Sequence, residues 1–271
     1  MDYREPICPF DASDYTGVPD AEPTGQRMNV PAMIRQLDQL INAGRAVKAQ
    51  HFLEKKRAEA AGMGDWRAEL SILNEMMGQY RFGNRREEAL AAVNDALALI
   101  REHRLGSTVS GATVLLNAAT TMKHLGRAEE SLPVFRHVSR VYADNLDPTD
   151  YRFAGLYNNM ALSCVDVGDY AAAERYYRAA AEVLRRRGGQ DNDLAVTCCG
   201  LAELYDRQDP LDERVGECMD RAWEHLNAPE LAHDGYHGLT IRKCLPCFDR
   251  FGFFVYAREL RERLEEIRGG T

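Results

Sequence analysis

The chain has 271 residues and a formal net charge of −8, from 34 basic and 42 acidic side chains. This acidic balance argues against general affinity for nucleic acid or for an anionic membrane, because both need a basic surface. No apolar run is long enough to cross a bilayer, and the acidic first residues lack the basic and apolar regions of a secretory signal. Seven scattered cysteines are typical of free thiols in a reducing compartment, so we expect a cytoplasmic protein.

The predicted elements begin after an acidic segment. Residues 1–29 are rich in proline and acids and poor in aliphatic side chains, so we expect an extended arm whose few large apolar side chains pack on the first hairpins. Residues 30–271 show apolar positions at helical spacing, interrupted by turn residues. These turns predict six helical hairpins, at about 31–62, 65–104, 107–146, 150–188, 191–228 and 236–268.

A period of 42 residues runs through the expected hairpins. A two-helix repeat of this length cannot bury its apolar face alone, so its copies must stack on one another. The period therefore predicts an all-α solenoid of about six hairpins. Mostly small side chains at the marker positions let helices approach closely, although the one valine predicts looser packing in the fifth hairpin. The markers, each near the start of a second helix, are Ala89, Ser131, Ala173, Val215 and Ala257.

The residues around each turn resemble the tetratricopeptide repeat (TPR) family. The resemblance covers about residues 31–268 and is strongest in 65–190. A 42-residue period is longer than the family's usual 34 and is similar to long-helix relatives such as kinesin light chain and bacterial peptide-sensing regulators. The best copy of the motif consists of Asn159-Met160-Ala161, Gly168-Asp169-Tyr170, Ala173, Tyr176-Tyr177 and Ala180; Gly83-Asn84 with Glu87-Glu88-Ala89-Leu90 and Gly126-Arg127 with Glu129-Glu130-Ser131-Leu132 repeat parts of it.

This resemblance implies a binding protein. The family forms a right-handed superhelix in which the first helix of each hairpin lines a concave groove, and the groove commonly holds an extended peptide or a partner helix. We therefore expect a protein or peptide partner, no nucleic acid, no membrane and no cofactor. Alternatively, the N-terminal arm itself lies in the groove as a stand-in ligand.

Three consecutive repeats carry asparagine nine residues before the turn glycine, at Asn74, Asn117 and Asn159. An amide side chain both donates and accepts hydrogen bonds, so such a row could grip the backbone of an extended chain. The resemblance places this position on the groove wall. The alternative is that each asparagine bonds a backbone carbonyl of the adjacent hairpin and serves the stack. We call these three asparagines the rungs of the row. Asn158 lies beside the third rung, Asn159, and the fifth repeat has Gly200 at the matching position, so the row ends there.

Four basic residues extend this candidate site. Lys123 and Arg81 lie near the ends of expected first helices, and Arg242 and Lys243 lie in the last one. Together they could hold an acidic or carboxylate-bearing ligand. The alternative is that they are solvated ends of helices.

A C-x-x-C sequence, Cys244 to Cys247, follows His233 and His237. These four side chains could ligate zinc, but their order and spacing do not match the usual finger patterns. A redox C-x-x-C normally follows a strand, which the pattern does not predict here. We expect buried core thiols and no metal. No nucleophile motif or glycine-rich phosphate loop occurs either, so we expect no catalytic activity.

The last expected hairpin is rich in aromatic residues, which would close the end of the core. Any aromatic side chain of this hairpin that stays exposed would mark a homodimer contact. The sequence thus favours a non-catalytic scaffold that binds protein or peptide in a solenoid groove. The alternative is an intracellular peptide-sensing or sequestering regulator without its own DNA-binding domain; a metal or redox protein is the third reading. The aromatic residues are Phe248, Phe251, Phe253, Phe254 and Tyr256.

Overall fold

A computed structural model describes residues 27–269 of the chain. Most of the arm predicted at 1–29 lies outside these residues. Every regular element in the described part is helical, and none of its helices is long and apolar enough to span a membrane. The α-helices are α1 (Val30–Asn42), α2 (Ala46–Gly62), α3 (Trp66–Phe82), α4 (Arg86–Glu102), α5 (Val109–His124), α6 (Ala128–Asn145), α7 (Arg152–Asp166), α8 (Tyr170–Arg187), α9 (Asp191–Gln208), α10 (Arg214–Leu226), α11 (Gly235–Arg250) and α12 (Phe254–Gly269).

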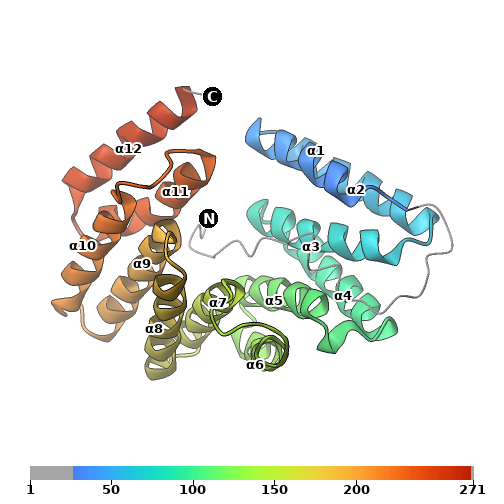
Figure 1. The fold of residues 1–271 in the computed structure, drawn as a ribbon, viewed down its shortest axis with the longest axis horizontal. Helices are drawn as coiled ribbons and strands as arrows, with labels where there is room; N and C mark the ends of the chain where they lie inside the picture. The colour runs from blue at the N-terminus through green and yellow to red at the C-terminus, as the bar shows by residue number, and fades with distance from the viewer. Residues whose placement is uncertain (1–26, 270–271) are drawn as a thin grey trace. The chain divides into compact units, whose positions relative to one another are not determined.

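These helices form the six predicted hairpins, α1–α2 through α11–α12, each within a few residues of the expected bounds (Figure 1). The prediction of an all-α stack of hairpins is therefore confirmed. Left-handed residues at the turns, such as Gly126 and Gly168, let the chain reverse without strain. Asparagine or aspartate caps several helices; Asp65, for example, accepts a hydrogen bond from the Ala68 backbone N–H at the start of α3.

The turn of the second hairpin differs from the expectation. There Asn84, not Gly83, has the left-handed backbone, with φ of 54°. Gly83 is required for another reason: a Cβ on it would lie 2.5 Å from Nε2 of Gln50. That amide reaches across from α2 to donate a hydrogen bond to the Gln79 carbonyl, at 3.2 Å.

The described residues divide into two compact units, an N-terminal unit of residues 27–145 and a C-terminal unit of residues 146–269. The N-terminal unit contains α1 to α6, and a short 3₁₀ turn, Leu105–Ser107, links its second and third hairpins. The C-terminal unit contains α7 to α12. Four of the five marker positions are wholly buried where helices cross, which confirms the close approach inferred from their size; these four are Ala89, Ser131, Ala173 and Ala257.

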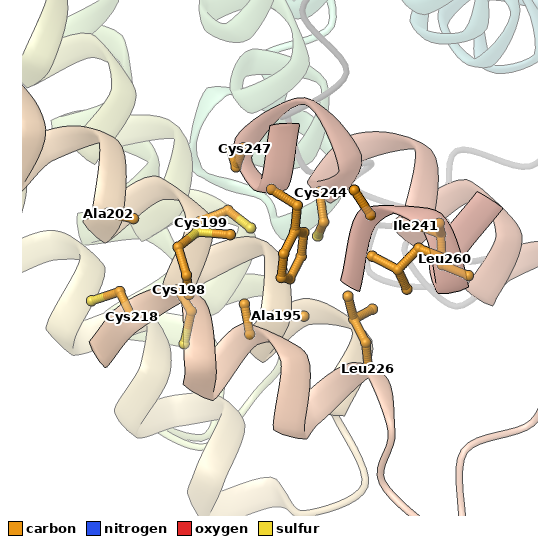
Figure 2. Close-up of a cluster of buried hydrophobic side chains, with 14 of the residues drawn as sticks. Ala195, Cys198, Cys199, Ala202, Cys218, Leu226, Ile241, Cys244, Cys247 and Leu260 are labelled. Atoms are coloured by element: carbon orange, nitrogen blue, oxygen red, sulfur yellow. The ribbon is translucent and has the colours of Figure 1, made fainter. Parts of the chain in front are cut away.

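The last two hairpins share one apolar core (Figure 2). Small residues of α9, including Ala195 and Ala202, let α10 and α11 pack closely on either side, and Leu260 fills the space from α12. The larger Val215 lies at the start of α10 and packs at the margin of this core, only partly buried.

A three-residue latch joins the first hairpin to the second and recurs between the fourth and the fifth. In the N-terminal unit, the Tyr80 hydroxyl at the end of α3 donates a hydrogen bond to Glu54 of α2, at 3.1 Å. Arg85 donates to the same Glu54 oxygen at 3.2 Å and places its guanidinium over the Tyr80 ring, 4.6 Å from its centroid. Each side chain thereby holds the other two in place.

The C-terminal unit repeats the latch with the same chemistry. The Tyr205 hydroxyl at the end of α9 donates to Glu174 of α8 at 3.1 Å. Arg214 lies 3.8 Å from that glutamate oxygen and 3.8 Å above the Tyr205 ring. In both units the latch takes its acid from one hairpin and its tyrosine and arginine from the next.

Candidate functional site

We use the term first-helix face for the side of each unit formed by the first helices of its hairpins. In the N-terminal unit α3 packs against α5, and two asparagines of the predicted row meet there. Asn117 Nδ2 donates to Asn74 Oδ1 at 2.7 Å, and Asn74 Nδ2 donates to Glu75 Oε1 at 3.3 Å. Asn74 is buried and engaged at both ends of its amide, whereas Asn117 is partly exposed.

The two asparagines of α7 have different surroundings. Asn158 faces the neighbouring α9, where its Nδ2 donates to Thr197 Oγ1 at 3.0 Å. Asn159 donates instead to Gly155 O of its own helix, at 3.0 Å. Its Oδ1 is the one buried side-chain nitrogen or oxygen in the described residues that has no hydrogen-bond partner. An unpaired buried acceptor costs about 1–3 kcal/mol of folding free energy.

The predicted asparagine row is therefore uneven. None of the three rungs bonds a backbone carbonyl of an adjacent hairpin, which was the expected structural role. At the fourth position, Gly200 leaves room for a tyrosine of the preceding helix: a Cβ there would lie 2.6 Å from Cε1 of Tyr177. The asparagine row therefore ends at Gly200, where the Tyr177 ring occupies the space that a larger side chain would need.

The predicted basic residues lie deeper than expected. Arg81, Lys123 and Lys243 are all buried, so the alternative of solvated helix ends is wrong for these three. Arg81 Nη1 donates to Thr121 Oγ1 of α5 at 3.3 Å, which joins two first helices. The ammonium group of Lys243 acts electrostatically on Asp193 of α9. Arg242 is partly exposed.

The C-x-x-C thiols are core residues. Cys244 and Cys247 are wholly buried, and both contact Cys199 across the α9–α11 interface (Figure 2). Hydrogen bonds with these two thiols that favour the protonated form of Cys199, together with burial, raise the pKa of Cys199 well above its usual value. A thiol in this state is a poor nucleophile and a poor ligand.

The two histidine candidates do not converge with those thiols. His237 is buried, with its Nδ1 2.9 Å from Asn192 Oδ1, and the ring of His233 stacks on it with centroids 4.9 Å apart. Burial lowers the pKa of His237 to about 4, so the ring is neutral near pH 7. Within residues 27–269 no group of three potential metal ligands is arranged to hold an ion.

The sequence reasoning missed Glu75, which lies beside Asn74 on α3. Burial raises the pKa of its carboxyl from 4.5 to about 7, the Asn74 hydrogen bond opposes that rise, and the charge of Asp38 on α1 adds to it. Glu75 was detectable as an acid adjacent to the first rung, in a helix whose other central positions are mostly apolar.

The pH dependence of stability tests this assignment. The folded carboxyl of Glu75 keeps its proton up to about pH 7, whereas the unfolded chain loses it near pH 4.5, so stability falls as pH rises between these values. We expect Glu75→Gln to gain about 2 kcal/mol relative to wild type between pH 4.5 and pH 8, measured by urea unfolding. Glu59→Gln on α2 is the control, because Lys56 lowers the pKa of Glu59 and its titration lies below this range. A pH-independent difference for Glu75→Gln would contradict the assignment.

Known proteins share this arrangement of hairpins. The sequence profile of the tetratricopeptide repeat family matches residues 152–213. Among solved structures, BtubC (BKLC) from P. vanneervenii is similar with a TM-score of 0.54 and 16% identity, over 90% of this chain and 92% of that one. A Podosopora anserina putative kinesin light chain with nearly identical TPR-like repeats has a TM-score of 0.52 and 16% identity, over 74% of this chain and 95% of its own. No curated protein matches the sequence.

Proposed function

We propose that this chain is a tetratricopeptide repeat protein and acts as a non-catalytic scaffold that binds an extended protein segment on its first-helix faces. The observation that carries the proposal is the buried Asn159 Oδ1 without a hydrogen-bond partner. A folded chain tolerates such an acceptor at a cost, and a donor from a bound segment would remove that cost. A backbone N–H is the donor that every extended peptide offers at regular intervals.

Asn117 supports the same function in the N-terminal unit. Its hydrogen bond to Asn74 fixes the orientation of the amide, while partial exposure leaves the side chain within reach of a ligand. A pre-oriented polar group binds at a lower entropic cost than a mobile one. We assign backbone recognition to Asn117 and Asn159, and an orienting role to Asn74 and Asn158.

The basic residues would contribute charge rather than direct contact. Arg242 is the one of the four with an exposed portion, so we assign it the direct contact with an acidic group of the partner. Arg81, Lys123 and Lys243 would act from within the stack through their positive potential. The described cysteines are all free thiols, which supports our inference of a reducing, cytoplasmic location.

An affinity capture from the native cell tests the proposal. We expect Asn117→Ala/Asn159→Ala to lose partners that the wild-type protein retains. Its thermal midpoint should fall by a few degrees at most, because Asn159→Ala removes an unpaired acceptor together with one hydrogen bond to its own helix, and Asn117→Ala removes one hydrogen bond. The mass of the captured species separates a protein partner from the short free peptide of a peptide-sensing regulator.

Asn94→Ala is the matched control, because Asn94 is an exposed asparagine on the second helix α4. It should capture the same partners as the wild-type protein. Identical partners for the double variant, or a collapse of its stability, would contradict the proposal and favour a structural role for the asparagines.

A further inference from the structure

In the N-terminal unit, the middle of α3 carries a glycine, Gly78, close to the buried Asn74. Helical geometry places Gly78 one turn beyond Asn74 and Glu75 and between them in angle. A Cβ built on Gly78 meets no atom of the described residues within 4 Å. We call this the α3 notch, formed by Asn74, Glu75 and Gly78, with Asp38 of α1 at its edge.

A glycine in the middle of a helix needs a reason. It costs up to about 1 kcal/mol relative to alanine, because it loses more backbone entropy on folding. Gly83 and Gly200 each make room for a neighbouring side chain, but Gly78 makes room for nothing in the described residues. Bare helix backbone beside open space is where another chain can approach closely.

The two acids of the notch are Glu75 and Asp38, and the Glu75 carboxyl has no cationic partner among the described residues. Within residues 27–269, Glu75 receives one hydrogen bond, from the neutral amide of Asn74, and the charged group that acts on it is the acidic Asp38. No lysine or arginine among the described residues pairs with it or offsets its burial. The nearby acids Glu54 and Glu69 each have an arginine partner, so Glu75 differs from its surroundings.

Asn117 and Asn74 give the notch a polarity. The amide of Asn117 donates to Asn74, and the amide of Asn74 donates to Glu75, so a directed chain of hydrogen bonds crosses from α5 through α3. A segment gripped at Asn117 would extend towards a carboxylate whose acceptor capacity is only partly used.

We propose that the α3 notch receives a lysine or arginine side chain of the bound segment, with its aliphatic stem over Gly78 and its cationic group between Glu75 and Asp38. This proposal rests on the proposed function and specifies one chemical feature of the partner. A cation there would satisfy the buried carboxyl and relieve its repulsion from Asp38. An acidic segment would be rejected at this position.

Two synthetic peptides test this. Both are extended twelve-residue chains of alanine, serine and threonine that differ at one central position, lysine in one and norleucine in the other. We expect the wild-type protein to bind the lysine peptide about tenfold more tightly in a fluorescence anisotropy titration at pH 8, where Glu75 is ionised. Glu75→Gln should abolish this preference, whereas Glu59→Gln should keep it.

Gly78→Ala provides a variant that should not destabilise the fold. It adds a methyl group in open space within a helix, so its stability should equal or exceed that of the wild-type protein. We expect it to weaken binding of both peptides by obstructing the notch. In addition, NMR of carboxyl-labelled glutamate should show the Glu75 pKa falling when the lysine peptide binds and not when the norleucine peptide binds.

The outcomes separate the two proposals. If wild-type protein binds both peptides equally, or if Glu75→Gln keeps the lysine preference, the notch assignment is wrong while groove binding stands. If it binds neither peptide, both proposals fail. If Asn117→Ala abolishes binding of both peptides and Glu75→Gln abolishes only the preference, both proposals are supported.

Discussion

Gly111→Ala is expected to destabilise the N-terminal unit by about 1–3 kcal/mol, the range for forcing extra volume into a packed site. A Cβ on Gly111 would lie 2.1 Å from the carbonyl oxygen of Leu105 and 2.8 Å from its carbonyl carbon. Both atoms are backbone, so no side-chain rotation relieves the clash. The 3₁₀ turn or the start of α5 would have to move, and Leu105 is itself buried.

Urea unfolding followed by circular dichroism measures this effect, and amide hydrogen exchange locates it. The first turn of α5 and the 3₁₀ turn should lose protection before the other hairpins do. Gly216→Ala is the control, since that glycine lies in α10 with no atom within 4 Å of an added Cβ. This control should be neutral or slightly stabilising. Equal stability of Gly111→Ala and wild type would show that the close approach at Leu105 is absent in solution.

Phe248→Ala is expected to cost about 3–5 kcal/mol, the range for removing a buried aromatic side chain. Phe248 is wholly buried, and its ring lies edge-on to three other aromatic rings, at centroid distances of 6.4 Å to Trp223 and 6.3 Å to Phe253 and Tyr256. Truncation leaves a cavity where α10, α11 and α12 meet. We expect the last hairpin to open first.

Tryptophan fluorescence reports this loss, because Trp223 stacks on Tyr256 at 4.2 Å in the same cluster. Phe254→Ala is the matched control: this ring is 67% exposed, so its removal should change stability by less than about 0.5 kcal/mol. We propose Phe254 and its neighbour Val255 as the part of this hairpin available to a second copy. Light scattering of wild type and Phe254→Ala would detect such a dimer. Similar losses for Phe248→Ala and Phe254→Ala would contradict the described packing.

The hairpins were predictable because their signals are local. Gly126 and Gly168 stop helices through backbone conformation alone, and the apolar spacing between turns reports burial directly. The exact role of Gly83 was not predictable, since it depends on Gln50, which is 33 residues away in the sequence and adjacent only in the fold. From the local sequence alone, such a glycine is assigned the left-handed backbone conformation of the turn.

The candidate site was less predictable for the same reason. The spacing of Asn74, Asn117 and Asn159 indicates equivalent positions, and equivalent positions were expected to have equivalent partners. Their partners instead differ: Asn74 meets an asparagine of a neighbouring helix, whereas Asn159 bonds to its own helix. The pKa of Glu75 likewise depends on burial between helices. A periodic sequence predicts where side chains lie, but their hydrogen bonds depend on non-periodic neighbours.

The Tyr–Glu–Arg latch has a consequence for the design of new arrays from this chain. Because Glu54 and Glu174 belong to the hairpin that precedes their partners, a single hairpin is not the interchangeable part. Exchanging the first or fourth hairpin would remove the acid from a tyrosine–arginine pair, and exchanging the second or fifth would remove that pair from its acid. A recombination boundary placed in the turn of a hairpin, after its tyrosine, would still separate the arginine from the tyrosine and the acid. A transferred segment should therefore begin just before the second helix that supplies the acid. It should end after the start of the second helix of the next hairpin, so that it contains the acid, the tyrosine and the arginine of one joint.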